Sequence, residues 1–171
     1  KVGHEKGISS TYDNQNTSFG IYANNQMPGT VYLNISMYAM YKGLSEHFYL
    51  SQSFYDLLIK LPSIVSDLAI TVFIYSFVKK QTSKKSALIS SSLYLFNPVV
   101  IYNSAVWGQT DSLNNLFFYL SVIFLINKKY FYSLLMIAFS LYIKLSILPF
   151  LPFIFLIILK QKLISIKKLL F

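Results

Sequence analysis

A dense polar cluster interrupts the apolar sequence within Asn97–Leu113. Asn103, Gln109 and Asp111 lie there beside Trp107, the only tryptophan in the chain. A carboxylate can act as a general base, hold a metal ion or accept hydrogen bonds from a hydroxyl-rich ligand. An indole can stack on the apolar face of a sugar or on a prenyl chain. We therefore predict a binding or catalytic site here, although Trp107 by itself is also typical of an anchor at a membrane interface.

Three further charged residues lie inside otherwise apolar segments, at Lys60, Asp67 and Lys144. A charge within a membrane span costs on the order of 3 kcal/mol and usually marks a function. Lys60 and Asp67 are seven residues apart, which places them on one face of a helix. The alternative interpretations are snorkelling of the two lysines towards the interface and a structural hydrogen bond for Asp67.

The composition is that of a membrane protein rather than a soluble one. Of the 171 residues, 54% are hydrophobic and only 12% are charged, against about 25% charged residues in soluble domains. The net charge is +9, but the lysines form short runs between apolar segments, as in cytoplasmic membrane loops. This grouping argues against a nucleic-acid partner. The absence of cysteine excludes disulfides and thiolate metal sites.

Five apolar segments are long enough to be read as helical crossings. Pro98 is expected to kink the second of them, and Lys144 with the prolines after it is expected to divide the last long apolar run into two helices. The fold class is therefore all-α, a polytopic transmembrane helical bundle with about five crossings. The segments are Leu57–Val78, Ser86–Trp107, Ser112–Asn127, Tyr130–Ile143 and Ser146–Leu159.

The distribution of charge orients these segments. Five crossings place Lys79–Lys85, Lys128-Lys129 and the C-terminal lysines together on the cytoplasmic side, as the positive-inside rule requires. The turn Trp107–Asp111 then lies on the extracytoplasmic side, and all six acidic residues lie outside or in the outer half of a span. We predict a multi-pass protein of the plasma or endoplasmic reticulum membrane whose active face is extracytoplasmic.

The N-terminal part is polar and differs from the rest. Residues from Lys1 to about Met27 predict a loop, and Thr30–Leu44 predicts a helix lying along the membrane interface. This gives an extracytoplasmic region 1–55 and a transmembrane domain 56–171. Because the chain begins with Lys1 and shows no signal peptide, we expect it to be a fragment that lacks an N-terminal span.

Four motifs resemble a known family in their order and spacing. They are Lys60-Leu61-Pro62 followed by Asp67, Asn97-Pro98, Trp107-Gly108-Gln109-Thr110-Asp111, and Lys144 followed by Pro149. Over about residues 28–160 the chain resembles the GT-C superfamily of membrane glycosyltransferases, and most closely the mannosyltransferases related to the enzymes of glycosylphosphatidylinositol (GPI) anchor synthesis. It departs from the family at Gln26-Met27-Pro28-Gly29, where the family has Tyr-Pro-Pro-Gly.

The resemblance implies an enzyme that moves a sugar, most simply mannose, from a polyprenyl-phosphate carrier to a glycan, lipid or protein acceptor outside the membrane. Asp111 is then the catalytic residue, and the lysines offset charge on the departing phosphate. The substrate-binding residues would be Trp107, Gln109, Lys144, Lys60, Asp67 and Asn97. No cofactor is evident and no metal ligands are identified, although related enzymes sometimes use a divalent metal.

Two alternatives belong to other functional classes. The chain could be a non-enzymatic transporter or lipid-handling protein in which Lys60, Asp67 and Lys144 line a substrate path. Such proteins carry internal repeats with broken helices in matching halves, and no such repeat is present. The chain could instead be an inactive partner of a glycosyltransferase. An acidic residue soon after a preceding span would favour catalysis, and Asp13 cannot be matched to that position.

Overall fold

The computed structural model describes the backbone of residues 26–170 and the side chains of residues 26–160. These residues form helices and the turns between them, without a β-strand among the described residues, so the predicted all-α class is confirmed. The predicted N-terminal loop falls outside the described residues except for Gln26 and Met27, as does Asp13. The division into regions 1–55 and 56–171 stays a prediction.

The helices follow the predicted segments up to Ile143, but the predicted helix Ser146–Leu159 is wrong in its bounds, because a 3-10 helix precedes a longer α-helix there. Pro28 begins the first described helix, where its missing N–H costs no hydrogen bond. The bounds are α2 (Pro28–Ser45), α3 (Gln52–Gln81), α4 (Lys84–Leu95), α5 (Pro98–Ile101), the π-helix η3 (Tyr102–Trp107), α6 (Asp111–Ile126), α7 (Tyr130–Ile143), the 3-10 helix η4 (Leu145–Phe150) and α8 (Leu151–Leu170).

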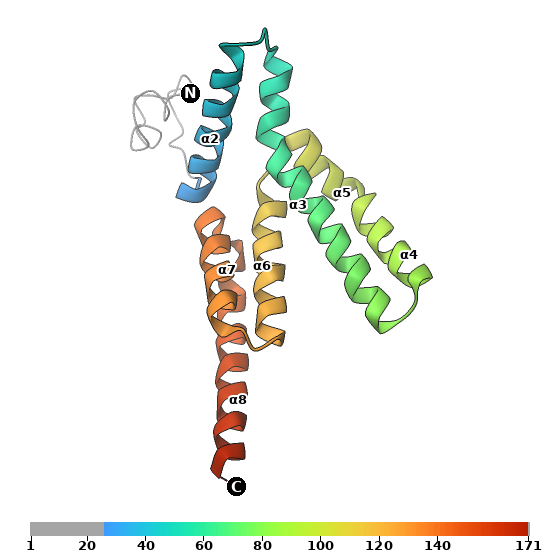
Figure 1. Cartoon of the computed structure of the whole chain (residues 1–171), viewed down its shortest axis with the longest axis vertical. Coiled ribbons are helices and arrows are strands. Elements are labelled where there is room, and N and C mark those ends of the chain that lie inside the picture. The colour runs from blue at the N-terminus through green and yellow to red at the C-terminus, as the bar shows by residue number, and fades with distance from the viewer. Residues whose placement is uncertain (1–25, 171) are drawn as a thin grey trace.

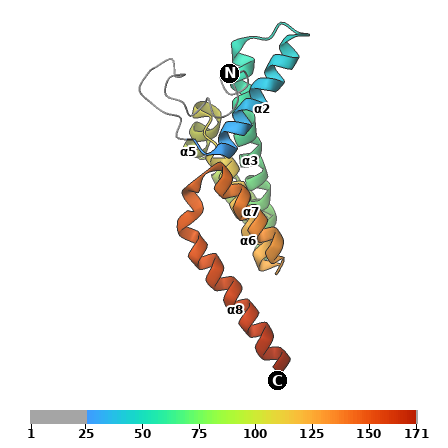
Figure 2. The ribbon, with the colours of Figure 1, turned by 90° about the vertical axis from the view of Figure 1, so that its left-hand side faces the viewer.

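Two antiparallel hairpins make up the body of the molecule. In Figure 1, α3 and α4 meet at a turn towards the lower right, and α6 and α7 meet at a turn near the bottom of their pair. α8 starts near the upper end of α7 and extends beyond the α6–α7 turn (Figure 2). The turns after α3 and α6 therefore lie at one end of the hairpins, and the turn between η3 and α6 lies at the other end.

α2 stands beside the first part of α3 instead of lying across the ends of the other helices (Figure 1). The ring of Tyr55 on α3 packs against the rings of Tyr38 and Tyr41, with centroids 5.8 and 5.2 Å apart. These contacts hold α2 and α3 together above the level at which α6 begins. The position of α2 relative to a membrane stays a prediction.

Both predicted helix breaks are confirmed. Asn97 caps the short helix α5 by accepting a hydrogen bond from the Val99 N–H at 2.9 Å, and Pro98 follows it because proline cannot continue a preceding helix. Lys144 adopts an extended conformation, with φ −158° and ψ 139°, which ends α7. The sequence did not predict the π-helix between Tyr102 and Trp107.

Among the described residues, buried polar side chains outnumber buried apolar ones. The largest side chains that are almost completely buried are Ile70, Asn114, Ser63, Ser66, Ser121, Ser133 and Ser140. Large apolar side chains face outward instead, among them Val72, Phe77 and Phe139. Small and hydroxyl side chains between helices, with apolar side chains outside, are typical of helices packed in lipid. A small apolar cluster of Leu125, Ile137, Ile147 and Ile154 joins α6, α7, η4 and α8.

Helix length alone supports fewer crossings than predicted. Among the described residues, Gln52–Gln81 is the one helix long and apolar enough to cross a membrane, and 28% of its most apolar window is buried. The apolar helices Asp111–Ile126 and Tyr130–Ile143 have 16 and 14 residues. They are about 24 and 21 Å long at 1.5 Å per residue, which is shorter than a hydrocarbon core of about 30 Å. The five predicted crossings are therefore not confirmed.

Candidate functional site

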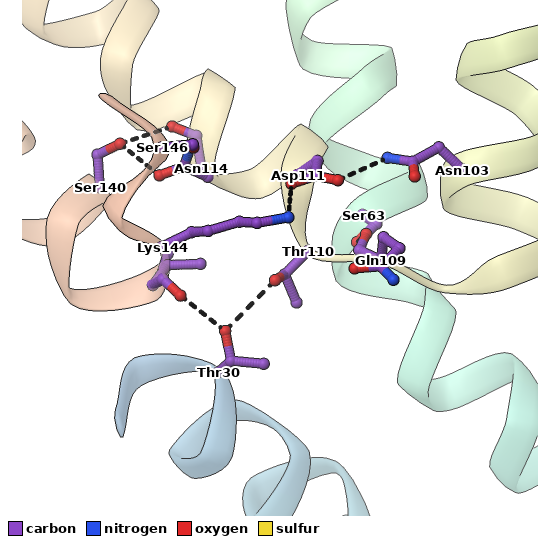
Figure 3. A network of polar contacts seen from close by, with 11 residues as sticks. Thr30, Ser63, Asn103, Gln109, Thr110, Asp111, Asn114, Ser140, Lys144 and Ser146 are labelled. Atoms are coloured by element: carbon purple, nitrogen blue, oxygen red, sulfur yellow. Dashed lines mark hydrogen bonds and ion pairs between the residues drawn. The ribbon is translucent and has the colours of Figure 1, made fainter. Parts of the chain in front are cut away.

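Four helices meet at one polar junction, which we define by Thr30, Ser63, Gln109–Asp111 and Lys144 (Figure 3). Thr30 lies at the start of α2, and Ser63 lies in the first half of α3. Gln109–Asp111 form the turn that leads into α6, and Lys144 directly follows α7. The Ser63 hydroxyl donates to the backbone carbonyl of Gln109 at 2.6 Å, which fixes this turn against α3. The junction lies at the end of the hairpins opposite the lysine-rich turns.

Gly108 allows the chain to turn into the junction. Its φ of +78° lies in the left-handed region, where residues with a Cβ are disfavoured. A Cβ added there would lie 3.1 Å from Cγ of Lys60, so the stem of Lys60 packs closely over the glycine. Lys60 therefore borders the junction through the aliphatic stem of its side chain.

Asp111 and Lys144 form an ion pair at the centre of the junction. The second carboxylate oxygen of Asp111 accepts a hydrogen bond from the Asn103 amide at 3.2 Å (Figure 3). Asp111 is also the first residue of α6, where the helix dipole stabilises a negative charge. The side chains of Lys144 and Asp111 remain 40% and 33% exposed, so the pair can be reached from outside. Each carboxylate oxygen therefore has one partner, and the two contacts hold the carboxylate in one orientation.

Asn114 holds Lys144 in place by bridging the break after α7. Its amide lies 2.6 Å from the Ser140 hydroxyl and 2.7 Å from the Ser146 hydroxyl. When the amide nitrogen faces Ser140 it also reaches the Ser140 backbone carbonyl at 2.8 Å. Asn114 is 1% exposed, and an amide in an apolar surrounding is strongly favoured to keep such partners. The geometry of the ion pair therefore depends on this buried amide.

α2 is attached to the junction through its first turn. The Thr30 hydroxyl donates to the backbone carbonyl of Ile143 at 2.9 Å and lies 3.3 Å from the Thr110 hydroxyl. Gly29 permits this approach, since a Cβ there would lie 2.5 Å from the Tyr142 carbonyl oxygen. Gly29 and Thr30 therefore place the start of α2 against the end of α7, directly before Lys144.

The other predicted site residues fall into two groups. Trp107 borders the junction at the end of η3, with 66% of its surface exposed, and its ring meets that of Tyr102 edge-on at 6.1 Å. Asp67 and Asn97 are not part of the junction. Asp67 is buried lower on α3 and accepts a hydrogen bond from the Tyr94 hydroxyl at 2.8 Å, and Asn97 caps α5.

Sequence reasoning did not identify Thr30, Ser63, Asn114 and the serines that contact Asn114. Their signal is weak, because a single hydroxyl in an apolar helix is common. A detectable signal is the period of the small and polar residues: Ser63, Ser66 and Asp67 recur at three and four residues and are all buried. Such a period marks the face of a membrane helix that packs against its neighbours.

The junction offers a carboxylate, an ammonium group and an exposed indole to a polar ligand at a membrane surface. An ammonium group can bind a phosphate as a point charge, and the indole provides an apolar face for a sugar ring. No three His, Asp or Glu side chains among the described residues gather closely enough to hold a metal ion.

Comparison with known proteins gives one family. The model of the family described as GPI transamidase subunit PIG-U matches residues 16–170, which is most of the chain. No curated protein matches, and no solved structure matches. The GPI-related part of the resemblance found in the sequence is therefore confirmed.

The match also corrects the predicted activity. A transamidase subunit belongs to a complex that attaches protein to GPI and is not a glycosyltransferase, so the prediction of a mannose-transferring enzyme is wrong. The polyprenyl-phosphate sugar donor predicted as a partner loses its support with it. The motifs around Asp67, Asn97 and Asp111 misled because they belong to helix breaks, caps and inter-helix contacts in this fold, which a catalytic and a non-catalytic membrane protein can share.

Proposed function

Because this chain belongs to the PIG-U family of GPI transamidase subunits, we propose that it is a non-catalytic membrane subunit of a GPI transamidase complex. The family match over residues 16–170 is the observation that carries this proposal. The setting would be the endoplasmic reticulum membrane, together with other subunits and a protein substrate destined for GPI.

In this proposal the hairpins cross the membrane, with five crossings made by α3, by α4 with η3, by α6, by α7, and by η4 with α8. The burial of serines and the exposure of large apolar side chains support lipid on the outside. Lys60 and Lys79 on α3 are separated by about 28 Å along the helix axis, close to the hydrocarbon thickness. The shorter helices α6 and α7 are accommodated by local thinning and by snorkelling of Lys128 and Lys129.

The junction then lies at the lumenal surface and binds the polar part of the GPI-linked substrate. Lys144 and Lys60 bring positive charge to a phosphate, Trp107 stacks on a sugar, and Asp111 and Gln109 accept or donate hydrogen bonds to hydroxyls. The exposure of Trp107 and of the ion pair supports this role. Asn97 contributes indirectly, by capping the helix that leads to Trp107.

Purification tests the proposal directly. The full-length protein carrying an affinity tag is isolated from membranes in mild detergent, and the eluate is assayed for removal of the C-terminal signal from the precursor of a GPI-anchored reporter. We expect the activity to co-purify. Trp107→Ala should raise the KM for the GPI substrate about tenfold, the loss expected for one stacking contact, and Trp107→Phe should retain most of the affinity. An eluate with mannosyl-transfer activity and no transamidase activity would contradict the proposal.

A further inference from the structure

Asp67 is a buried carboxylate with one oxygen that no described residue satisfies. The residue is 4% exposed on α3. Its Oδ1 accepts a hydrogen bond from the Tyr94 hydroxyl at 2.8 Å, whereas its Oδ2 has no hydrogen-bond partner among the described residues. An unsatisfied buried carboxylate oxygen is costly, because desolvation is not offset by a bond. Asp67 therefore requires a donor that the described part of the chain does not supply.

A cavity of about 90 Å³ lies beside Asp67, between α3 and the segment from α4 to η3. Apart from Asp67 its lining is apolar, with Ile64, Leu68 and Ile101 among its residues, and the hydroxyl of Ser104 already donates to the carbonyl of Val100. Leu68 and Ile101 are 49% and 42% exposed. The cavity thus borders the outer surface of the molecule at the level of the carboxylate.

The depth of Asp67 decides which surroundings it meets. It lies about 10 Å along α3 from Lys60 and about 18 Å from Lys79. If these lysines mark the two interfaces, Asp67 lies within the hydrocarbon region, where acyl chains carry no hydrogen-bond donor. A charged side chain at such a depth is expected to pair with another charged group. Lipid cannot supply that group, and protein can.

We propose that Asp67 and its cavity receive a lysine or arginine from a transmembrane helix of another subunit. This inference rests on the proposed function, in that it assumes a membrane complex. The bond from Tyr94 engages Oδ1, so Oδ2 is the oxygen that still lacks a donor. A cation compensates the carboxylate charge better than a neutral donor does. The cavity has room for about three water-sized groups, which fits the end of a basic side chain, and its apolar walls suit the aliphatic stem.

Site-specific photo-crosslinking tests the inference in the assembled complex. A photoreactive benzoylphenylalanine replaces Leu68 at the cavity in the full-length protein, and a second sample carries it at Leu134 of α7, which is similarly exposed at 54%. After irradiation of native membranes, adducts are mapped by mass spectrometry. We expect Leu68, but not Leu134, to cross-link to a transmembrane segment of another subunit that contains lysine or arginine.

The charge dependence of the adduct distinguishes pairing from simple proximity. Asp67→Asn retains an acceptor for Tyr94 and replaces the unpaired oxygen with an NH₂ group, so it should reduce the Leu68 adduct by about tenfold. Ser66→Ala is the matched control, because the Ser66 hydroxyl donates within its own helix to Pro62, and it should leave the adduct unchanged. Replacing the basic residue found in the adduct with methionine should produce the same loss and no additional loss in combination with Asp67→Asn.

The remaining outcomes overturn the inference. These are an adduct with lipid alone, an adduct with a segment that lacks a basic residue, and a yield that Asp67→Asn does not alter. Co-purification of transamidase activity with the tagged protein is measured in the same membranes. If activity co-purifies and the cross-link fails, only the pairing of Asp67 is wrong. If activity does not co-purify, the proposed function itself fails.

Discussion

At the scale of single residues, the ion pair of Asp111 and Lys144 is the main electrostatic contact of the junction. Lys144→Met should destabilise the protein by about 1–2 kcal/mol, between the values for exposed and buried pairs, because Asp111 would remain charged without its cation. The measurement is the thermal unfolding midpoint of the protein in detergent. Lys85→Met, at the exposed start of α4, is the control and should change the midpoint little.

The double variant Lys144→Met with Asp111→Asn separates pairing from packing. Removing the carboxylate charge should recover part of the stability lost in Lys144→Met, since no unpaired charge then remains. If each substitution lowers the unfolding midpoint and the two losses simply add in the double variant, the side chains do not interact directly.

Sequence reasoning identified the junction only in part at this scale. Trp107, Gln109 and Asp111 are close in sequence, so their proximity follows without knowledge of the fold. Lys144 was expected at the same end because the charge distribution fixes the order of the crossings. Its pairing with Asp111 depends on the buried amide of Asn114 across the break after α7, and no local pattern encodes such a contact between distant segments.

At the scale of elements, α2 is docked by its first turn. Gly29→Ala should destabilise the protein by about 1–3 kcal/mol, the usual cost of overpacking, because the added Cβ would meet the Tyr142 carbonyl oxygen at 2.5 Å. Gly43→Ala is a matched control on the same helix, with no atom within 4 Å of the added Cβ. It should be neutral or stabilise by about 0.5 kcal/mol through helix propensity.

Limited proteolysis of the α2–α3 connection measures the docking separately from global stability. Gly29→Ala should increase cleavage between residues 46 and 51, since α2 would be held less firmly. Equal cleavage of the Gly29→Ala and Gly43→Ala proteins would show that the close approach of α2 to α7 is not required.

The helix ends were predicted well because proline and lysine act locally. Pro98 and Lys144 break helices through their own backbone or solvation requirements, and the structure ends helices at both positions. The π-helix from Tyr102 to Trp107 and the upright placement of α2 were not predicted, because both depend on contacts with α3 and α7 and not on local periodicity.

At the scale of the whole molecule, the two ends of the hairpins should lie on opposite sides of the membrane. The chain contains no cysteine, so single cysteines report without background. In sealed vesicles of known orientation, Gln109→Cys should react with a membrane-impermeant maleimide from the lumenal side and Gln81→Cys from the cytoplasmic side. Reaction of both from the same side would contradict the five-crossing arrangement.

The sequence predicted a membrane protein, but it did not predict membership of a family of transamidase subunits. Composition and the lysine runs indicated a membrane protein, and the GT-C resemblance led correctly to GPI but wrongly to sugar transfer. An apolar helix that begins with a carboxylate occurs in catalytic and in non-catalytic membrane proteins, so this pattern does not distinguish them. Only the family match distinguishes the two, because the distinction lies in what the complete complex does.

Depletion of the protein separates a role in GPI attachment from a role in mannose transfer. In cells that lack the chain, the GPI lipids and a GPI-anchored reporter are analysed together. For a transamidase subunit, we expect fully mannosylated GPI lipid to accumulate and the reporter to remain as a precursor with its C-terminal signal uncleaved. The full-length protein should restore attachment. Accumulation of GPI lipid lacking mannose, with normal attachment of any complete lipid, would contradict a role in GPI attachment.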